Sequence, residues 1–190
     1  MRKNKQVFNI AVTGVLTALV FVTVTFVRFP VPTGIVQGGL VHLGNAPMFI
    51  AAIVFGKKQG AFAGGVGMSL FNILVAPGPH WAPFTLLTRG AMGYAVGAIA
   101  EKRQGKSYKL NLFAIAISAI IFIIGMYVSE IILLFFGFGG MQPPEDMFLA
   151  LVPLGSIPGN IIQVVASAAV TLPLVSKLRR YRERYLYNDE

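Results

Sequence analysis

Basic residues divide this chain into long apolar runs, and their positions constrain the fold more than any other feature. All but two of the 16 Lys and Arg residues lie near the two ends or in gaps around 57–58 and 102–109. Short loops that carry Lys or Arg stay on the cytoplasmic side of a membrane. Both termini and every second connection are therefore predicted to be cytoplasmic, which requires an even number of crossings. Arg28 and Arg89 are the two exceptions.

The composition indicates an integral membrane protein rather than a soluble domain. The chain is 55% hydrophobic and only 12% charged, with a mean hydropathy of +0.71. This leaves too little polar surface for a soluble domain of 190 residues. The formal charge of +9 comes from residues that flank apolar runs and form no continuous basic face. The predicted counter-charge is therefore lipid at the inner leaflet, and no nucleic-acid partner is expected.

The apolar runs predict six membrane-spanning helices. A crossing needs about 20 apolar residues. The candidates are residues 7–27, 41–56, 59–76, 83–100, 110–136 and 148–175. The predicted fold class is an all-α membrane protein, a compact bundle of six transmembrane helices with N and C termini cytoplasmic, forming one domain over residues 1–190 of a bacterial cell membrane protein. The external connections, near 28–40, 77–82 and 137–147, are rich in Gly and Pro and form either a binding rim or simple turns.

Small residues predict where helices approach closely. Glycines at four-residue spacing occur in 60–64 and 93–97, a pattern that allows backbone contact inside a bundle. The first span carries Ala11, Gly14 and Ala18 on one helical face near its cytoplasmic end. That face either docks a partner's helix or packs against the next span.

Polar residues gather in the outer half of the predicted bundle and point to a binding pocket. At 1.5 Å per residue, Arg89 and Glu130 both lie ~9 Å below the external surface. One buried charge at mid-membrane costs ~3 kcal/mol, so both require partners or a polar cavity. The candidate substrate-binding residues are His42, Asn45, Asn72, His80, Trp81, Arg89, Tyr127, Glu130, Asn160 and Gln163, with Ser167 on the same face as the last two.

Several of these residues also have a purely structural interpretation. An Arg89–Glu130 ion pair would stabilise the bundle without touching a ligand. His80 and Trp81 fit an interfacial aromatic belt as well as a folded-over loop, and Tyr127 either stacks on a ligand or fills space between helices. Arg28 is expected to extend its side chain to the outer headgroups.

Enzyme signatures are missing from the chain. There is no phosphate-binding G-x-x-x-x-G-K-[ST] loop, no H-E-x-x-H metal pair and no G-x-S-x-G nucleophile motif. We expect no catalytic residues, no metal site and no cofactor. A binding protein of this kind cannot couple ATP hydrolysis to transport by itself, so another protein would have to supply the energy.

Three stretches resemble the substrate-binding S components of energy-coupling factor (ECF) vitamin transporters, of the hydroxymethylpyrimidine or pyridoxine type. They are residues 44–52 (GNAPMFIAA) with 55–56 (FG), 60–67 (GAFAGGVG) and 72–74 (NIL). The resemblance implies capture of a vitamin outside the cell, together with a transmembrane coupling (T) subunit and two cytoplasmic ATPase subunits. It also implies that Ala11, Gly14 and Ala18 contact the T subunit, although the usual Ala-x-x-x-Ala spacing is not kept.

The ligand prediction depends on Arg89. If Arg89 and Glu130 neutralise each other, the pocket suits a small uncharged ring such as a hydroxymethyl pyrimidine or a vitamin B6 pyridine. If Arg89 is not paired, it would hold the carboxylate of a vitamin such as pantothenate.

Two other classes of protein remain as alternatives. One is an autonomous secondary transporter or channel, which needs ionisable residues through the full membrane depth. The other is a membrane enzyme.

Overall fold

The computed structural model describes residues 2–33, 36–75, 78–136 and 154–187. Within these ranges the chain forms six α-helices and a β-hairpin. In chain order the elements are α1 (Arg2–Phe26), β1 (Arg28–Thr33), β2 (Val36–His42), α2 (Asn45–Ile50), the π-helical turn η1 (Ala51–Phe55), α3 (Lys57–Leu74), the 3-10 turn η2 (Pro79–Trp81), α4 (Ala82–Glu101), α5 (Tyr108–Phe135) and α6 (Ile157–Tyr187).

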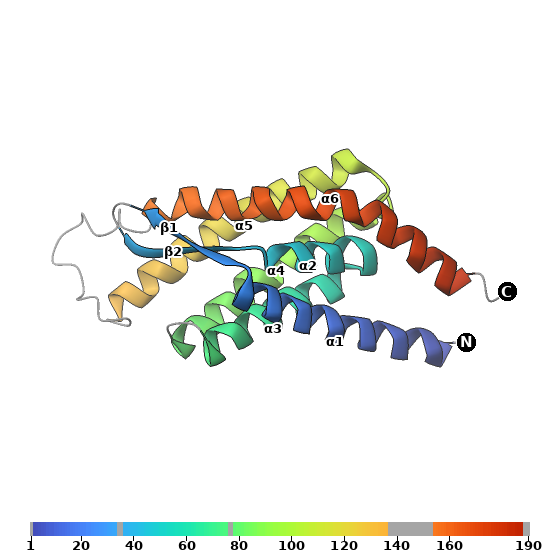
Figure 1. Cartoon of the computed structure of the whole chain (residues 1–190), viewed down its shortest axis with the longest axis horizontal. Coiled ribbons are helices and arrows are strands. Elements are labelled where there is room, and N and C mark those ends of the chain that lie inside the picture. Colours follow the sequence, from blue (N-terminus) through green and yellow to red (C-terminus); the bar gives the residue numbers. More distant parts are fainter. Residues whose placement is uncertain (1, 34–35, 76–77, 137–153, 188–190) are drawn as a thin grey trace.

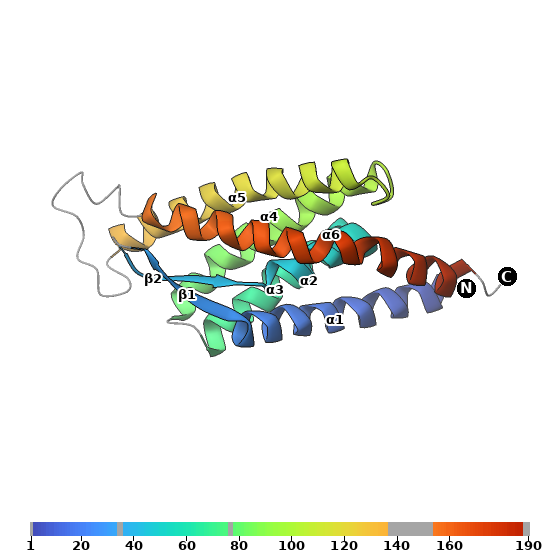
Figure 2. The same ribbon diagram turned by 45° about the horizontal axis from the view of Figure 1, so that its top comes forward.

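The helices run along one long axis, and the two ends of the bundle differ in content (Figure 1). The start of α1 and the end of α6 lie at one end, together with the turns between η1 and α3 and between α4 and α5. We call this the basic end, because Lys57, Lys58 and the Lys and Arg residues of 102–109 and 177–184 belong to it. The other end carries the end of β1, the start of β2 and the end of α5, and we call it the hairpin end (Figure 2). The basic connections, the start of α1 and the end of α6 thus lie at the same end of the bundle, as the positions of Lys and Arg predict. That this end is cytoplasmic stays a prediction.

A short helix, α2 continued by η1, lies at the centre of the bundle. Residues 45–54 are all buried, and this segment packs against α1, α3, α4 and α6. An apolar sequence on every face of a helix requires such all-round burial. Pro47 is tolerated because the first turn of a helix has no internal acceptors for its N–H groups. The helix ends at Gly56, whose φ of 119° is strained for any residue with a Cβ.

The structure differs from the predicted all-α fold by the hairpin. Residues 28–33 and 36–42 pair as antiparallel strands, with Arg28 opposite His42. The sequence predicts an external connection over 28–40 and a second span from residue 41. The helix in that region covers only Asn45–Phe55, about 16 Å at 1.5 Å per residue, against a hydrocarbon core of about 30 Å. A short apolar run does not distinguish a spanning helix from a strand followed by a buried helix.

Three helices of the described residues are long and apolar enough to cross a membrane. They are the segments Gln6–Phe26, Tyr108–Leu133 and Leu154–Glu183. The count of six crossings remains a prediction.

The helix α6 continues to Tyr187, well past the predicted end of the last span at 175. Lys and Arg end the apolar run, but both are good helix formers. The predicted start at 148 and the 137–147 connection lie outside the described residues.

Glycines hold α3 and α4 in backbone contact, as the four-residue spacing predicts. A Cβ on Gly93 would lie against the Gly60 carbonyl and 2.8 Å from the Ala61 nitrogen, closer than real Cβ atoms approach. A Cβ on Gly97 would meet the backbone of Lys57 in the same way. The two helices therefore touch without intervening side chains, which brings the residues of α4 close to α3 and α2.

An ion pair fastens the basic end of this helix pair. One Glu101 oxygen accepts the backbone N–H of Lys57 at 3.1 Å, and the other lies 3.0 Å from Lys57 Nζ. The backbone N–H and the ammonium of Lys57 lower the pKa of Glu101, and Glu101 raises the pKa of Lys57. The carboxylate also serves as an acceptor for the first turn of α3, where N–H groups have no partner in the helix.

Acid should therefore loosen this end of the bundle. Because the pKa of Glu101 is depressed in the folded protein, its contribution is complete above the ordinary pKa near 4.5 and is lost as the pH falls through the lowered value. Glu101→Ala should cost about 1 kcal/mol through the lost acceptor, and Glu101→Gln less, because an amide oxygen still accepts. Thermal unfolding of both variants in detergent between pH 3 and 7 measures this. An acid-dependent loss that is identical in the wild type and in Glu101→Gln would contradict the assignment.

Candidate functional site

Arg89 forms the centre of a polar cluster inside the bundle. It lies on the face of α4 that turns inward, and only 5% of the residue is exposed. Its Nη1 donates to Asn45 Oδ1 at 2.8 Å and approaches Met92 Sδ at 3.7 Å. The guanidinium lies 3.7 Å from the ring centroid of Phe122 on α5, a cation–π contact. Arg89 thus joins α4 to α2 and α5 at a depth where lipid could not solvate it.

His42 and Asn45 belong to the same cluster. His42 ends β2, is buried, and accepts the N–H of Gly44 at Nδ1 over 3.2 Å, which assigns the ring hydrogen to Nε2. His42 lies near enough to Arg89 for the two side chains to interact electrostatically. Asn45 is fully buried at the start of α2. The turn between β2 and α2 therefore places both predicted residues beside Arg89.

A polar stripe on α6 faces the central helix. Gly159, Gln163, Ser167 and Thr171 recur every four residues and are buried, so they lie on one face of α6. A Cβ on Gly159 would contact Val41, and Thr171 donates to the Ala46 carbonyl at 3.3 Å. The intervening residues, Gln163 and Ser167, therefore lie along β2 and the start of α2, where His42 and Asn45 are found.

A second cluster lies nearer the hairpin end. Ser156, just before α6, donates to Glu130 Oε2 at 3.5 Å and accepts from Asn160 Nδ2 at 3.4 Å. Glu130, Ser156 and Asn160 are all partly exposed. Among the described contacts, Arg89 reaches Asn45 and Phe122, whereas Glu130 reaches Ser156. The hydrogen bond from Ser156 to Glu130 is long, so the carboxylate is able to accept a further hydrogen bond from a ligand.

The remaining predicted residues lie at other positions. Asn72 is partly buried and donates to Thr85 Oγ1 at 2.6 Å, which ties α3 to α4 one turn from Arg89 toward the hairpin end. His80 and Trp81 belong to η2, and their ring centroids are 6.3 Å apart. Tyr127 lies one turn before Glu130 on α5 and is half-buried. The structure thus brings His42, Asn45 and Arg89 together, links Glu130 to Asn160 through Ser156, and leaves Asn72 in a contact between helices.

Sequence reasoning missed three contributors to these clusters. Phe122 is one of many apolar residues of α5, and nothing in the pattern distinguishes it. Met92 lies one turn after Arg89, but a Met in a spanning helix is unremarkable. Ser156 could have been found, since it precedes Asn160 by four residues and a helical turn would bring the two together.

The face of α1 that carries Ala11, Gly14 and Ala18 is exposed. A Cβ on Gly14 would meet no atom within 4 Å. Ile10 and Val15 beside it are 73% and 67% exposed. A groove of about 390 Å³ borders this face, lined by Asn9, Ile10, Thr13, Gly14, Lys58, Gln59 and Phe62. The sequence left open whether this face docks a partner's helix or packs against the next span. Gly14 does not pack against another span.

Comparison with known proteins gave three informative sequence matches. A sequence model of the family described as "ECF-type riboflavin transporter, S component" matches residues 4–180. A Pyrococcus woesei protein, described as an uncharacterized protein in the gap 3' region, is 34% identical over 121 residues, which are 64% of this chain and 76% of that one. The thiamine precursor transporter HmpT of Lactococcus lactis subsp. cremoris is 29% identical over 99 residues, 52% of this chain and 58% of its own length.

A solved structure supports the fold over nearly the whole chain. It is described as "Structure and mechanism of the S component of a bacterial ECF transporter", and the two chains superpose with a TM-score of 0.73. The match covers 94% of this chain and 99% of that one at 23% sequence identity.

The fold and its long apolar helices define a helical protein of the membrane-embedded class. Since the family model covers most of its length, the chain belongs to the family of ECF-type riboflavin transporter S components. The family consists of transporter subunits and is not an enzyme family.

Proposed function

We propose that this chain captures a small vitamin or vitamin precursor at the hairpin end and hands it to an ATP-driven importer. The observation that carries the proposal is the pair of polar clusters around Arg89 and Glu130, enclosed by an apolar bundle of the S-component fold. The other subunits would be a transmembrane T subunit and two ATPase subunits, as the family assignment implies. The hairpin end would then face outward, in agreement with the excess of Lys and Arg at the other end.

Within this proposal, a neutral ring of the hydroxymethylpyrimidine or vitamin B6 class is the preferred ligand. The thiamine precursor transporter HmpT is among the relatives. Arg89 is engaged by Asn45 and Phe122 in the interior, so its guanidinium is not presented as a carboxylate clamp. Glu130 and Asn160 are partly exposed and offer an acceptor and an amide. An aminopyrimidine with a hydroxymethyl group supplies matching donors and acceptors, and Tyr127 is close enough along α5 to cover the ring.

Riboflavin is the second candidate, because the description of the matching family names it. Its tricyclic ring is larger than a pyrimidine and carries a polar ribityl chain. It would therefore need the space beside both the Arg89 cluster and the Glu130 cluster. An acidic vitamin such as pantothenate is the third, and it would require Arg89 to exchange Asn45 for the ligand.

Calorimetric titration of the purified protein tests the ligand and Glu130 together. We expect tight binding of the aminopyrimidine, and about a tenfold or greater loss of affinity in Glu130→Gln, because a hydrogen bond to a charged acceptor is worth roughly 1.5–3 kcal/mol. Glu101→Gln is the matched control, since it makes the same chemical change at the basic end and should leave the affinity unchanged.

Three results would move or overturn the assignment. Binding of riboflavin without any response to the pyrimidine or pyridine rings would favour the second candidate. Tight binding of an acidic vitamin that is lost in a folded Arg89→Gln variant would exclude a neutral ligand. Flux of the vitamin into liposomes that contain this chain alone would show an autonomous carrier and contradict the S-component role.

A further inference from the structure

We propose that the basic end contains a binding site for a phosphate ester, between the start of α5 and the last turns of α6. The structure has a cavity of about 270 Å³ there. Its lining includes Lys106, Asn111, Ser176, Arg179, Arg180 and Glu183. None of these residues belongs to the polar clusters around Arg89 and Glu130, so the inference does not depend on the identity of the transported ligand.

The charges that line the cavity favour an anion. Lys106, Arg179 and Arg180 are cations, and Glu183 is the single carboxylate among the lining residues. Glu183 accepts a hydrogen bond from Arg179 at 2.5 Å, so its charge is already matched. Arg180 makes a long Nε contact of 3.4 Å with the Ser176 carbonyl and remains exposed. Two cations are thus left for a ligand, and Arg and Lys are the usual phosphate-binding side chains.

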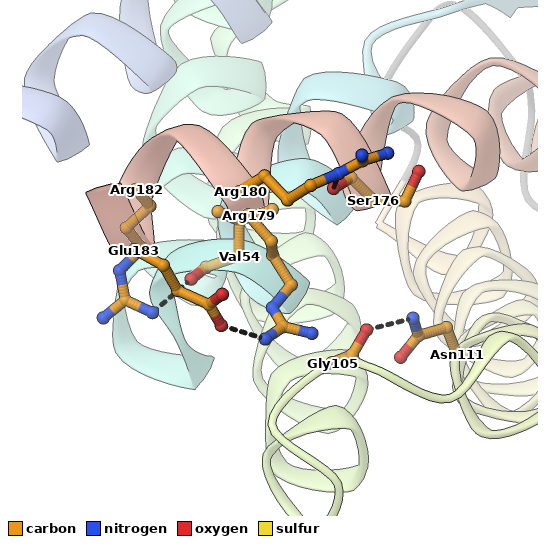
Figure 3. A network of polar contacts seen from close by, with 8 residues as sticks. All are labelled: Val54, Gly105, Asn111, Ser176, Arg179, Arg180, Arg182 and Glu183. Carbon is orange, nitrogen blue, oxygen red and sulfur yellow. Dashed lines mark hydrogen bonds and ion pairs between the residues drawn. The ribbon is translucent and has the colours of Figure 1, made fainter. Parts of the chain in front are cut away.

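Asn111 adds a requirement that a simple anion does not meet. Its Nδ2 donates to the Gly105 carbonyl at 2.8 Å, which fixes the orientation of the amide (Figure 3). Its Oδ1 then points away from that bond, and in the described part of the chain it has no hydrogen-bond partner although the residue is only 3% exposed. A buried acceptor left unsatisfied costs about 1–3 kcal/mol. A ligand with a hydroxyl or amine donor beside its phosphate would satisfy both Asn111 and the cations.

The depth of the cavity matches that of lipid headgroups. The third candidate span starts at Leu154, and about 20 helical residues cross the hydrocarbon core. Counting from Leu154, residues 176–183 therefore lie just beyond the core at the basic end. The phosphate of an anionic phospholipid such as phosphatidylglycerol, with its glycerol hydroxyls, has the required chemistry at that level. A soluble glycerol phosphate offers the same groups, so the source of the phosphate must be decided by experiment.

Native mass spectrometry of the protein released from nanodiscs tests the site. One set of nanodiscs contains phosphatidylcholine alone, and the other adds phosphatidylglycerol. We expect retained phosphatidylglycerol, reduced about tenfold in Lys106→Gln/Arg180→Gln. The matched control is Lys109→Gln/Lys177→Gln, which removes two exposed charges from the same end but from outside the lining, and should retain the lipid. Thermal unfolding of both double variants verifies that they are folded.

Calorimetry of the same two double variants in detergent, with sn-glycerol 3-phosphate and inorganic phosphate as probes, distinguishes the two sources. Binding of the soluble ester that only Lys106→Gln/Arg180→Gln weakens, without retained lipid, would support the site and assign it to a soluble phosphate. Equal losses in the two double variants would show diffuse surface attraction and overturn the proposal. Retention of phosphatidylcholine as strongly as phosphatidylglycerol, or no binding of any probe, would also overturn it.

Discussion

Replacing Gly93 with alanine is expected to destabilise this protein by about 3 kcal/mol or more, a large loss for one added methyl group. The added Cβ would lie against the carbonyl carbon and oxygen of Gly60 and 2.8 Å from the nitrogen of Ala61. These are backbone atoms of a packed helix, so no flexible side chain can turn aside. The two helices would have to separate, and α4 carries Arg89 on the same segment.

Gly90→Ala is the matched control for that experiment. It adds the same methyl group to the same helix, three residues earlier, where the nearest atom would be the Ala61 oxygen at 3.8 Å. That is ordinary van der Waals contact, so the change should stay within about 0.5 kcal/mol. Thermal or denaturant unfolding in detergent compares the two. Equal stability of Gly93→Ala and Gly90→Ala would show that α3 and α4 are farther apart than these distances indicate.

The second large effect concerns transport. Gly14→Leu combined with Ala18→Leu should abolish uptake in cells while leaving ligand affinity within about twofold, because both residues are exposed and Gly14 has open space around it. Leucine side chains on this face would hold a partner helix away from the close contact that small residues allow. Co-purification with the T subunit, together with calorimetric titration of the isolated variant, separates coupling from binding.

Ala116→Leu combined with Ala169→Leu supplies the control for added bulk. Both alanines are exposed, on α5 and α6, and neither belongs to the α1 face. This variant should assemble and transport normally. Assembly of the Gly14 and Ala18 variant at wild-type level would show that the T subunit docks elsewhere, and a joint loss of ligand affinity would show that the α1 face supports the binding site.

The amino-acid sequence by itself determined the membrane class, most of the helical runs and the relatedness to S components. Long apolar runs and clusters of Lys and Arg can be read from the sequence directly. Each determines the membrane position of its own segment, whatever the rest of the chain does. The glycine spacing also predicted correctly that α3 and α4 approach closely, because small residues at 60 and 93 permit backbone contact wherever those helices meet. The sequence also singles out polar residues such as His42 and Arg89, because lipid does not tolerate such groups without partners. Their part in ligand binding stays a prediction.

Only the tertiary structure decided which of these polar groups meet. Arg89 contacts Asn45 and Phe122, because the helix that begins at Asn45 is too short to cross a membrane and lies inside the bundle. The hairpin that makes this possible has no clear pattern of its own, since a run of apolar residues with glycines fits a loop, a strand or the start of a helix equally well. The same is true of the cavity at the basic end, where Asn111 and Arg179 are 68 positions apart and meet only after α5 and α6 pack together. Contacts between distant segments depend on how whole helices pack, and that information is not contained in any local stretch of sequence.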